Sequence, residues 1–501
     1  MKKVLLNIYP LLFAAYPVFA LRNQNLVYVN INAIIRSLLI SFLITAILLL
    51  LFKLIIKDWN KARLIATLII TLLFSYGHIY MQFEQLFEGF RHRYLAIIYL
   101  LTLILLSASL LRLQNIQPIN QFLANFSLIL LILALGQSLI YDLSLYKTAA
   151  KAENELHDRT AFTNQLSADL PDIYLIILDG YTRADVLKDE YDFDNSDFTG
   201  NLSELGFYVA ECSQSNYPIT KYSLSSVMNA DYLQNYSNIE MLPPLKSSFV
   251  NQTLQKLGYT TIAFENSATG HFDLLEDIHI SRNQQALGLV DLAGGPNEFE
   301  AELLKTTLFK LFYDMPQLIP GLTLTDIQQA EHNEHYRQTL FILDELENIP
   351  QMSGQNFVFA HILVPHPPYI FAPSGKFQWT DNKRSGYISN VEFINAHLFP
   401  VIKTIIEKSD IHPIIIIQGD HGAFGSAITP QMRLSILNAY YLNTESKAAL
   451  YSTITPVNSF RIIFNHYFDS DFPLLDDISY FMNKPDQFTQ DNIIKNNCTS
   501  P

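Results

Sequence analysis

The sequence predicts a membrane domain of five α-helices, followed by an α/β domain with a mostly parallel central sheet. Five apolar segments, each near the ~20 residues that a helix needs to cross a bilayer, lie within the first 143 of 501 residues. Beyond them, short β-branched runs alternate with helix-like stretches, which is typical of βαβ units. Two of these runs end in acidic or imidazole side chains, and strand ends of this kind build the sites of open α/β sheets.

The predicted membrane spans cover residues 4–21, 34–56, 64–81, 93–111 and 122–142. The first span would alternatively be a cleaved signal peptide, but it contains Pro10 and Pro17 and no clear small-x-small cleavage site. Basic residues precede the first span and crowd the second connection, which holds four Lys and Arg residues between positions 53 and 63. By the positive-inside rule the N-terminus is cytoplasmic, and five spans leave everything after residue 143 outside.

The charge distribution argues against nucleic acid as a partner. Residues 1–143 carry 11 Lys and Arg against 4 Asp and Glu, which leaves 22 basic against 43 acidic residues, a net charge of −21, for the rest of the chain. A domain with this charge repels phosphate backbones.

The chain has two cysteines, Cys212 and Cys498. They would be free to pair in an extracytoplasmic domain, and two free buried thiols are an equal alternative.

The part beyond the spans divides into a polar linker at residues 144–170 and an α/β domain at residues 171–501. In the third membrane connection, Phe83, Phe87 and Phe90 recur at helical spacing, which favours a short amphipathic helix in the outer interface. The alternative is a simple continuation of the third span. The α/β domain has expected strands at 173–177, 260–264, 357–363 and 414–417, and expected helices at 220–229, 324–349 and 390–408.

Two of these strands deliver candidate metal ligands. Asp179 follows the first strand and precedes Gly180, which lets the backbone turn away sharply. Asp420 and His421 follow the run of four isoleucines at 414–417. Adjacent carboxylate and imidazole ligands at a strand end suit Zn²⁺ or Mn²⁺, so the sequence predicts one divalent ion held by Asp179, Asp420 and His421.

Thr220 is the candidate nucleophile. Pro218 ends the preceding extended segment, and the spacing from Thr220 to Asn229 is compatible with a helix. In one interpretation Thr220 is a plain N-cap, which the segment taken alone favours. In the other, its alkoxide is stabilised by the helix dipole and by direct metal coordination, so that it attacks the substrate.

Two histidines form the last part of the constellation. His361 lies in the strand at 357–363, and Pro365 ends that strand so that His366 is presented from the loop. Two histidines within six residues beside such a loop are candidates for holding a phosphoryl oxygen or protonating a leaving group.

Taken in order, these motifs resemble the sulfatase-like branch of the alkaline phosphatase superfamily. The layout is similar to that of its membrane phosphotransferases, lipid A phosphoethanolamine transferase and lipoteichoic acid synthase, which also place five spans before an extracytoplasmic catalytic domain. The resemblance thus covers nearly the whole chain, although the match of the N-terminal part is one of layout. It implies that Asp179, Thr220, Asp420 and His421 bind the metal ion and that His361 and His366 surround the substrate phosphate.

Three positions depart from the family pattern. Asp179 stands where the phosphotransferases carry Glu, and Leu224 stands where sulfatases carry the arginine of their modification motif. No histidine follows His421 within about a dozen residues, where the phosphoethanolamine transferases have another. Arg433 and Lys221 are weaker candidates for supplying positive charge to the substrate site.

The resemblance implies a membrane-anchored enzyme that moves a phosphoethanolamine- or phosphoglycerol-type group from a lipid head group to an envelope glycan or lipid. It also implies the inner membrane of a bacterium, with the catalytic domain outside the cytoplasm. A threonine at position 220 cannot be oxidised to formylglycine, so sulfuric ester hydrolysis is the minority interpretation. A phosphodiesterase or phosphatase that uses water as acceptor shares the same ligands and stays open, as does a non-catalytic sulfatase-like binding module.

Overall fold

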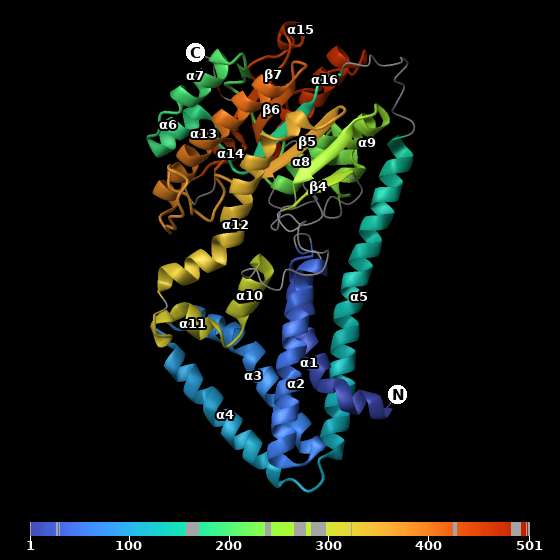
Figure 1. Ribbon diagram of the computed structural model, residues 1–501, viewed down its shortest axis with the longest axis vertical. Helices are drawn as coiled ribbons and strands as arrows, with labels where there is room; N and C mark the ends of the chain where they lie inside the picture. Colours follow the sequence, from blue (N-terminus) through green and yellow to red (C-terminus); the bar gives the residue numbers. More distant parts are fainter. Residues whose placement is uncertain are drawn as a thin grey trace. The chain divides into compact units, whose positions relative to one another are not determined.

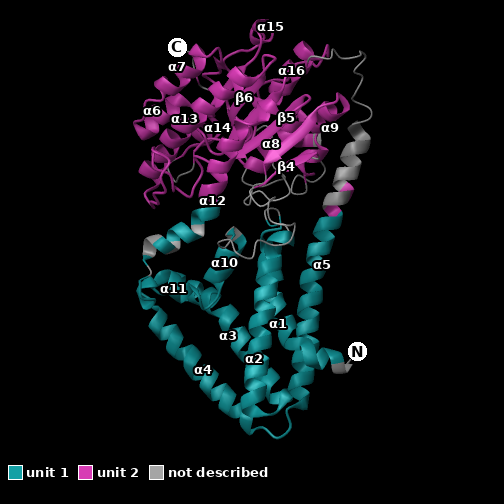
Figure 2. Cartoon of the chain, viewed as in Figure 1, with its two compact units in different colours: residues 1–143, 286–334 teal, residues 144–285, 335–501 magenta. Residues whose placement is uncertain are grey.

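The computed structural model describes residues 2–26, 29, 31–156, 170–235, 242–264, 277–281, 297–321, 323–423, 428–481, 492–496 and 498. Most of the predicted linker, residues 157–169, lies outside these ranges. The chain divides into two compact units, coloured in Figure 2: a helical unit of residues 1–143 and 286–334, and an α/β unit of residues 144–285 and 335–501. Residues 286–334, which the predicted boundaries assign to the α/β domain, therefore group with the helical unit; as functional boundaries, 1–143, 144–170 and 171–501 stay a prediction.

The helical unit confirms the prediction of five membrane-length helices. Each has a stretch long and apolar enough to cross a membrane. The helices, labelled in Figure 1, are α1 (Lys2–Gln24), α2 (Ile35–Ile56), α3 (Trp59–Leu86), α4 (His92–Arg112) and α5 (Gln117–Leu156).

The expected separate amphipathic helix around Phe83 is wrong. Helix α3 runs without a break to Leu86, and Phe87 caps its C-terminus with a backbone N–H bond to the Phe83 carbonyl. The Phe83 ring stacks on the rings of Phe87 and Phe90, at centroid distances of 5.8 and 5.2 Å. The three phenylalanines recur at helical spacing because the third span continues through this region. The alternative interpretation is therefore the correct one.

The α/β unit is built on a seven-stranded, mostly parallel sheet, as predicted. The strand order is β2-β7-β6-β1-β5-β3-β4. Strands β6, β1, β5, β3 and β4 are parallel to one another, and β7 pairs antiparallel with β6 and with β2. The strands are β1 (Ile173–Leu178), β2 (Tyr208–Val209), β3 (Thr260–Phe264), β4 (Ile278–Ile280), β5 (Asn356–Ile362), β6 (Ile414–Gly419) and β7 (Asn438–Tyr441).

Helices cover both faces of this sheet because the central strands are apolar on both faces. Along β1, Tyr174, Ile176 and Leu178 pack into one buried cluster, whereas Ile173, Leu175 and Ile177 pack into another. The first cluster contains residues of α6 (Ala184–Tyr191), α7 (Ser196–Glu204), α12 (Leu324–Leu346) and α13 (Lys383–Lys408), and the second contains residues of α8 (Thr220–Asn229), α9 (Phe249–Lys256) and α16 (Ser459–Tyr467). The other α-helices are α10 (Glu298–Thr306), α11 (Lys310–Asp314), α14 (Pro430–Leu434) and α15 (Thr444–Lys447).

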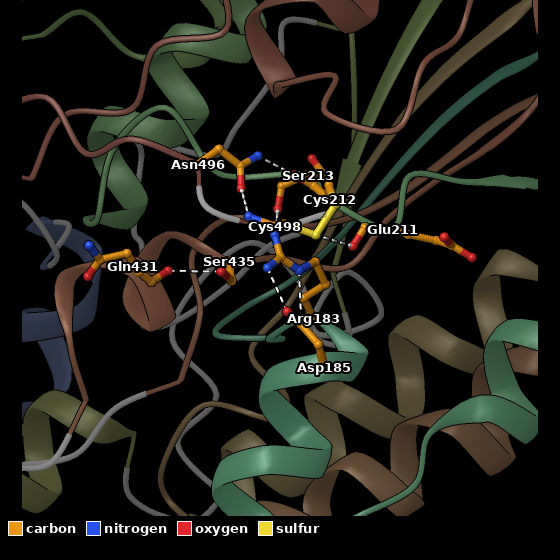
Figure 3. The surroundings of a disulfide bond; sticks show 9 residues. All are labelled: Arg183, Asp185, Glu211, Cys212, Ser213, Gln431, Ser435, Asn496 and Cys498. Carbon is orange, nitrogen blue, oxygen red and sulfur yellow. Dashed lines mark hydrogen bonds and ion pairs between the residues drawn. A yellow bond between two sulfur atoms is a disulfide. The ribbon is translucent and has the colours of Figure 1, made fainter. Parts of the chain in front are cut away.

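A disulfide settles the question that the sequence left open about the two cysteines. Cys212 and Cys498, 286 residues apart, are bonded (Figure 3). The side-chain amide of Asn496 donates to the Cys212 carbonyl at 2.6 Å, and the Cys498 N–H donates to the Asn496 side chain. The C-terminal segment is thus fastened to the α/β unit beside Ser213, whose carbonyl accepts a hydrogen bond from Arg183.

Candidate functional site

The candidate site lies where three adjacent central strands end. Strand β1 has β6 on one side and β5 on the other, and the register pairs Leu178 with Gly419 and Ile177 with His361. Asp179 is the first residue after β1, and Asp420 is the first residue after β6. Because the three strands are parallel and in this register, their carboxyl ends bring the two aspartates and His361 to the same edge of the sheet.

Asp179, Asp420 and His421 form a group that fits a metal ion. One ligand atom from each lies within 4.8 Å of the others, and all three residues are buried. His421 Nε2 lies 3.5 Å from Asp179 Oδ1 and 3.3 Å from Asp420 Oδ2. Two carboxylates and one imidazole at such distances leave room for a small cation between them, since zinc-to-ligand bonds are about 2.0–2.2 Å long.

The hydrogen bonds of these residues leave one nitrogen and two carboxylate oxygens of the group as candidate metal ligands. Asp420 Oδ1 accepts from the N–H groups of Gly180 and His421, each at 2.9 Å. His421 Nδ1 lies 2.9 Å from the Gly422 carbonyl, and since a carbonyl only accepts, Nδ1 carries the proton and leaves the Nε2 lone pair for a metal ion. Within the described residues, Asp179 Oδ1 and Asp420 Oδ2 are buried with no hydrogen-bond partner. Such buried oxygens are costly unless a cation binds them, so this donor set fits a divalent ion.

The electrostatics of the group support the same conclusion. Burial, together with the charge of Asp179, raises the pKa of Asp420. Burial alone would also raise the pKa of Asp179, but the neighbouring His366 and His361 hold it below its usual value. Burial and the charge of Arg433 lower the pKa of His421, so its imidazole is neutral. A divalent cation would relieve the repulsion between the two carboxylates that raises the pKa of Asp420.

Thr220 is the first residue of α8, and the N-cap interpretation is wrong. The cap position belongs to Ile219, whose side chain makes no capping bond. The Thr220 hydroxyl oxygen lies 3.2 Å from His421 Nε2. Thr220 is also among the groups that counter the rise in the pKa of Asp420. The hydroxyl therefore faces His421 and Asp420, two of the three ligand residues.

Both histidines lie beside Asp179. His361 Nε2 is 3.4 Å from Asp179 Oδ2, and the His366 backbone N–H donates to the Asp179 carbonyl at 2.9 Å. His366 Nδ1 lies 2.6 Å from the Pro367 carbonyl and so carries a proton.

Arg433 joins the two loops of the site. Its guanidinium donates to the Pro218 carbonyl at 3.0 Å and to the Gly422 carbonyl at 2.8 Å, so it connects the segment before Thr220 with the segment after His421. Burial lowers its pKa to about 10, so it stays charged at neutral pH. Lys221, the second residue of α8, is partly exposed, and its role stays a prediction.

Two residues that shape the site were not among the residues predicted from the sequence. A Cβ atom at Gly422 would lie 2.2 Å from the Met432 carbonyl oxygen, so only glycine lets the loop after His421 pack against α14. Tyr387 on α13 donates from its hydroxyl to the Gly180 carbonyl at 2.8 Å and accepts from the Thr182 N–H, which fixes the turn after Asp179. The glycine after a His is a signal for close packing, but nothing near Tyr387 in the sequence points to the site.

Comparison with known proteins finds matches among solved structures alone. No family model and no curated protein matches the chain. The structure of the C-terminal periplasmic domain of EptC from Escherichia coli, in complex with Zn, matches with 10% identity and a TM-score of 0.41 over 66% of this chain and 94% of that chain. The integral membrane lipooligosaccharide phosphoethanolamine transferase A of Neisseria meningitidis matches with 12% identity and a TM-score of 0.35 over 93% and 94%. BT1596, a 2-O GAG sulfatase, matches with 10% identity and a TM-score of 0.38 over 61% and 72%.

These structures are phosphoethanolamine transferases and a sulfatase, the classes of protein that the motifs resemble. At these identities and TM-scores the likeness assigns no role to a residue of this chain. The function therefore has to be argued from the geometry at the ends of β1, β5 and β6.

Proposed function

We propose that the chain is a metal-dependent membrane enzyme that transfers a phosphoethanolamine- or phosphoglycerol-type group from a lipid head group to an envelope glycan or lipid. The observation that carries the proposal is the position of the Thr220 hydroxyl, 3.2 Å from His421 Nε2. A threonine with a purely structural role does not need its hydroxyl beside a buried histidine that is a candidate metal ligand. A nucleophile needs this position, because a nearby base and cation lower the cost of forming its alkoxide.

In the first step, the Thr220 hydroxyl releases its proton to water, and its oxygen attacks the phosphorus of the donor phosphodiester. The bond from phosphorus to the lipid alcohol breaks as the bond from phosphorus to Thr220 forms. The N-terminus of α8 favours the negative charge that gathers on the phosphoryl oxygens. The departing alcohol oxygen takes a proton from one of the two histidines beside Asp179.

In the second step, a hydroxyl of the acceptor attacks the phosphothreonine. That hydroxyl gives its proton to the histidine that lost one. The bond from phosphorus to Thr220 breaks, and the Thr220 oxygen takes a proton from water, which regenerates the threonine. Positioning and charge neutralisation supply most of the rate in phosphoryl transfer, so a small set of charged groups suffices. Asp179, Asp420, His421 and Thr220 would hold one divalent ion, Zn²⁺ or Mn²⁺, which supplies positive charge next to the attacking oxygen.

The transfer reaction is tested with lipids. We expect full-length protein in vesicles to consume phosphatidylethanolamine or phosphatidylglycerol and release diacylglycerol, which mass spectrometry of the lipid fraction detects. Comparison of envelope lipids and glycans from cells with and without the protein should show an acceptor that gains the mass of the transferred group. Release of the free head group with no modified acceptor would establish the phosphodiesterase alternative. No turnover of either lipid by metal-loaded protein would contradict both.

The disulfide supports a location of the α/β unit outside the cytoplasm, because such bonds persist in oxidising compartments. We expect a reporter fused after residue 150 to be active only when it requires export. In intact cells, Cys212 and Cys498 should react with a thiol-specific polymer reagent only after reduction. A cytoplasmic reporter signal, or free thiols without reduction, would contradict this topology.

A further inference from the structure

The helical unit contains a segment that lies far along the chain from the five predicted spans. Residues 297–319, here the juxtamembrane segment, comprise α10, α11 and the short 3₁₀ helix Pro316–Leu318. They belong to the compact unit of residues 1–143 although about 150 residues separate them from it. The proposed reaction makes no use of this segment, so its presence in the helical unit has to be explained separately.

Specific contacts fasten the juxtamembrane segment to three membrane helices. Glu300 pairs through both carboxylate oxygens with the guanidinium of Arg36 on α2, with Nε–Oε1 at 2.7 Å. The Leu308 N–H donates to the Leu73 carbonyl of α3 at 2.8 Å. Asp314 lies 2.7 Å from Nε2 of His92, the first residue of α4. Phe299 and Leu303 pack into one buried cluster with residues of α1, α2 and α3, so the docking is apolar as well as ionic.

Glycine permits the closest of these approaches. A Cβ atom at Gly77 on α3 would lie 2.1 Å from the Lys305 carbonyl oxygen and 2.5 Å from the Thr306 carbonyl carbon. A helix interior usually avoids glycine, which costs about 1 kcal/mol relative to alanine. Here the glycine allows the backbone at the C-terminal end of α10 to pack directly against α3.

Three of these four contact points lie at one depth in the membrane. Each is about 18–20 residues from the cytoplasmic end of its helix: Arg36 from Ile56, Gly77 from Trp59, and His92 from Arg112. A helix of about 20 residues crosses the hydrocarbon core, so Arg36, Gly77 and His92 lie at the outer boundary. The juxtamembrane segment, which touches all three, lies at that boundary too.

Part of the segment is apolar and exposed at this depth. Leu308, Phe309, Leu318 and Ile319 are 38, 43, 50 and 41% exposed. The charges between them, Lys310 and Asp314, pair with each other at 2.9 Å, and Lys310 also lies over the Tyr80 ring of α3. Residues 308–319 therefore present apolar side chains with their charges paired, a surface that binds acyl chains better than it binds water.

We propose that residues 308–319 insert into the outer leaflet at the interface, as a membrane anchor separate from the five spans. The occupant of the exposed apolar surface is lipid. The anchoring is hydrophobic, because the charges of the segment are already paired within the helical unit. It is accordingly independent of anionic lipid and of salt.

The test uses a spin label on full-length protein in nanodiscs of phosphatidylcholine. Cys212 and Cys498 are bonded to each other, so a label attaches only to an introduced thiol. Leu318→Cys and Phe309→Cys report on the segment. Leu474→Cys is the matched control, since Leu474 is 45% exposed on the α/β unit, and Leu105→Cys on α4 is the control for the bilayer interior, being 64% exposed.

We expect the ratio of oxygen collisions to collisions with a water-soluble nickel chelate to be several-fold higher at positions 318 and 309 than at 474, and lower than at 105. The ratio should not change with salt or with added phosphatidylglycerol. A ratio at 318 and 309 equal to that at 474 would place the segment in water and overturn the proposal. Low collision rates with both reagents would show that protein, such as a second copy, covers the surface, and would overturn it as well.

Discussion

Asp420→Asn is expected to remove the bound metal ion and turnover together while the strand end stays folded. The asparagine oxygen can still accept from the Gly180 and His421 N–H groups that now bind Asp420 Oδ1. The other oxygen, Oδ2, has no hydrogen-bond partner among the described residues, and it becomes an uncharged amide that donates where a cation would bind. Loss of a ligand should weaken metal affinity by more than the about 10–100-fold that changes to residues supporting a ligand cost.

Metal analysis and thermal unfolding measure this effect without any assay of the reaction. Wild-type protein should hold one ion per chain, and a chelator should lower its free energy of unfolding by about 4 kcal/mol where the free ion had been at about 1,000 times its dissociation constant. Asp420→Asn should hold none and should not respond to the chelator. Without metal it should be at least as stable as wild type without metal, because burial and the charge of Asp179 both raise the pKa of Asp420, and these are costs of keeping it ionised.

Asp172→Asn provides the matched control. Asp172 precedes β1 at the opposite end of the same strand and accepts a hydrogen bond from the Asn356 N–H at 2.8 Å. Its replacement should change stability and leave the metal content at one ion per chain. If Asp420→Asn kept a full complement of metal and the wild-type response to the chelator, the ligand assignment would be wrong.

The strands that build the site could be predicted because their residues are apolar on both faces. The isoleucines at 414–417 and the run from Ile173 are buried on either side of the sheet, which only a central parallel strand requires. The ends of helices were harder to predict. Helix α13 begins at Lys383 and not near 390, because the Asn382 side chain caps it by accepting from the Ser385 N–H, at a point without apolar periodicity.

The juxtamembrane segment could not be predicted because its partners are distant in sequence. Glu300 pairs with Arg36 across 264 positions, and His92 meets Asp314 across 222. In its local sequence, none of these four residues differs from an ordinary charged residue at a protein surface. A pattern along one stretch of sequence reports the period of a helix but not which other element covers it.

Thr220 shows the same limit within the site. A threonine after a proline and before a helix fits an N-cap by sequence, and the helix does start there. In the structure the N-cap residue is Ile219, one position before Thr220, so the Thr220 hydroxyl makes no capping bond to the helix. That shift of one residue changes the expected result of a substitution.

Thr220→Ala is expected to abolish turnover with little change in stability. Because Ile219 occupies the cap position, the substitution removes no capping bond, and the free energy of unfolding should fall by less than the about 1 kcal/mol of a lost cap. If Thr220 is the nucleophile, turnover should fall by several orders of magnitude; loss of a nucleophile costs about 10⁶-fold in the best-studied catalytic unit. Thr220→Ser should keep partial activity, because it keeps the hydroxyl and loses the methyl group that restricts χ1.

A true cap on another helix separates the two roles of a hydroxyl at a helix start. Ser248 caps α9 by accepting from the Asn251 N–H, so Ser248→Ala should cost about 1 kcal/mol of stability and leave turnover per folded molecule unchanged. Intact-protein mass spectrometry with a phosphodiester donor should show a covalent adduct on wild type that is absent from Thr220→Ala. An alanine variant that turns over donor at the wild-type rate, or that still forms the adduct, would exclude Thr220 as the nucleophile, since no oxygen would remain at that position to form the bond to phosphorus.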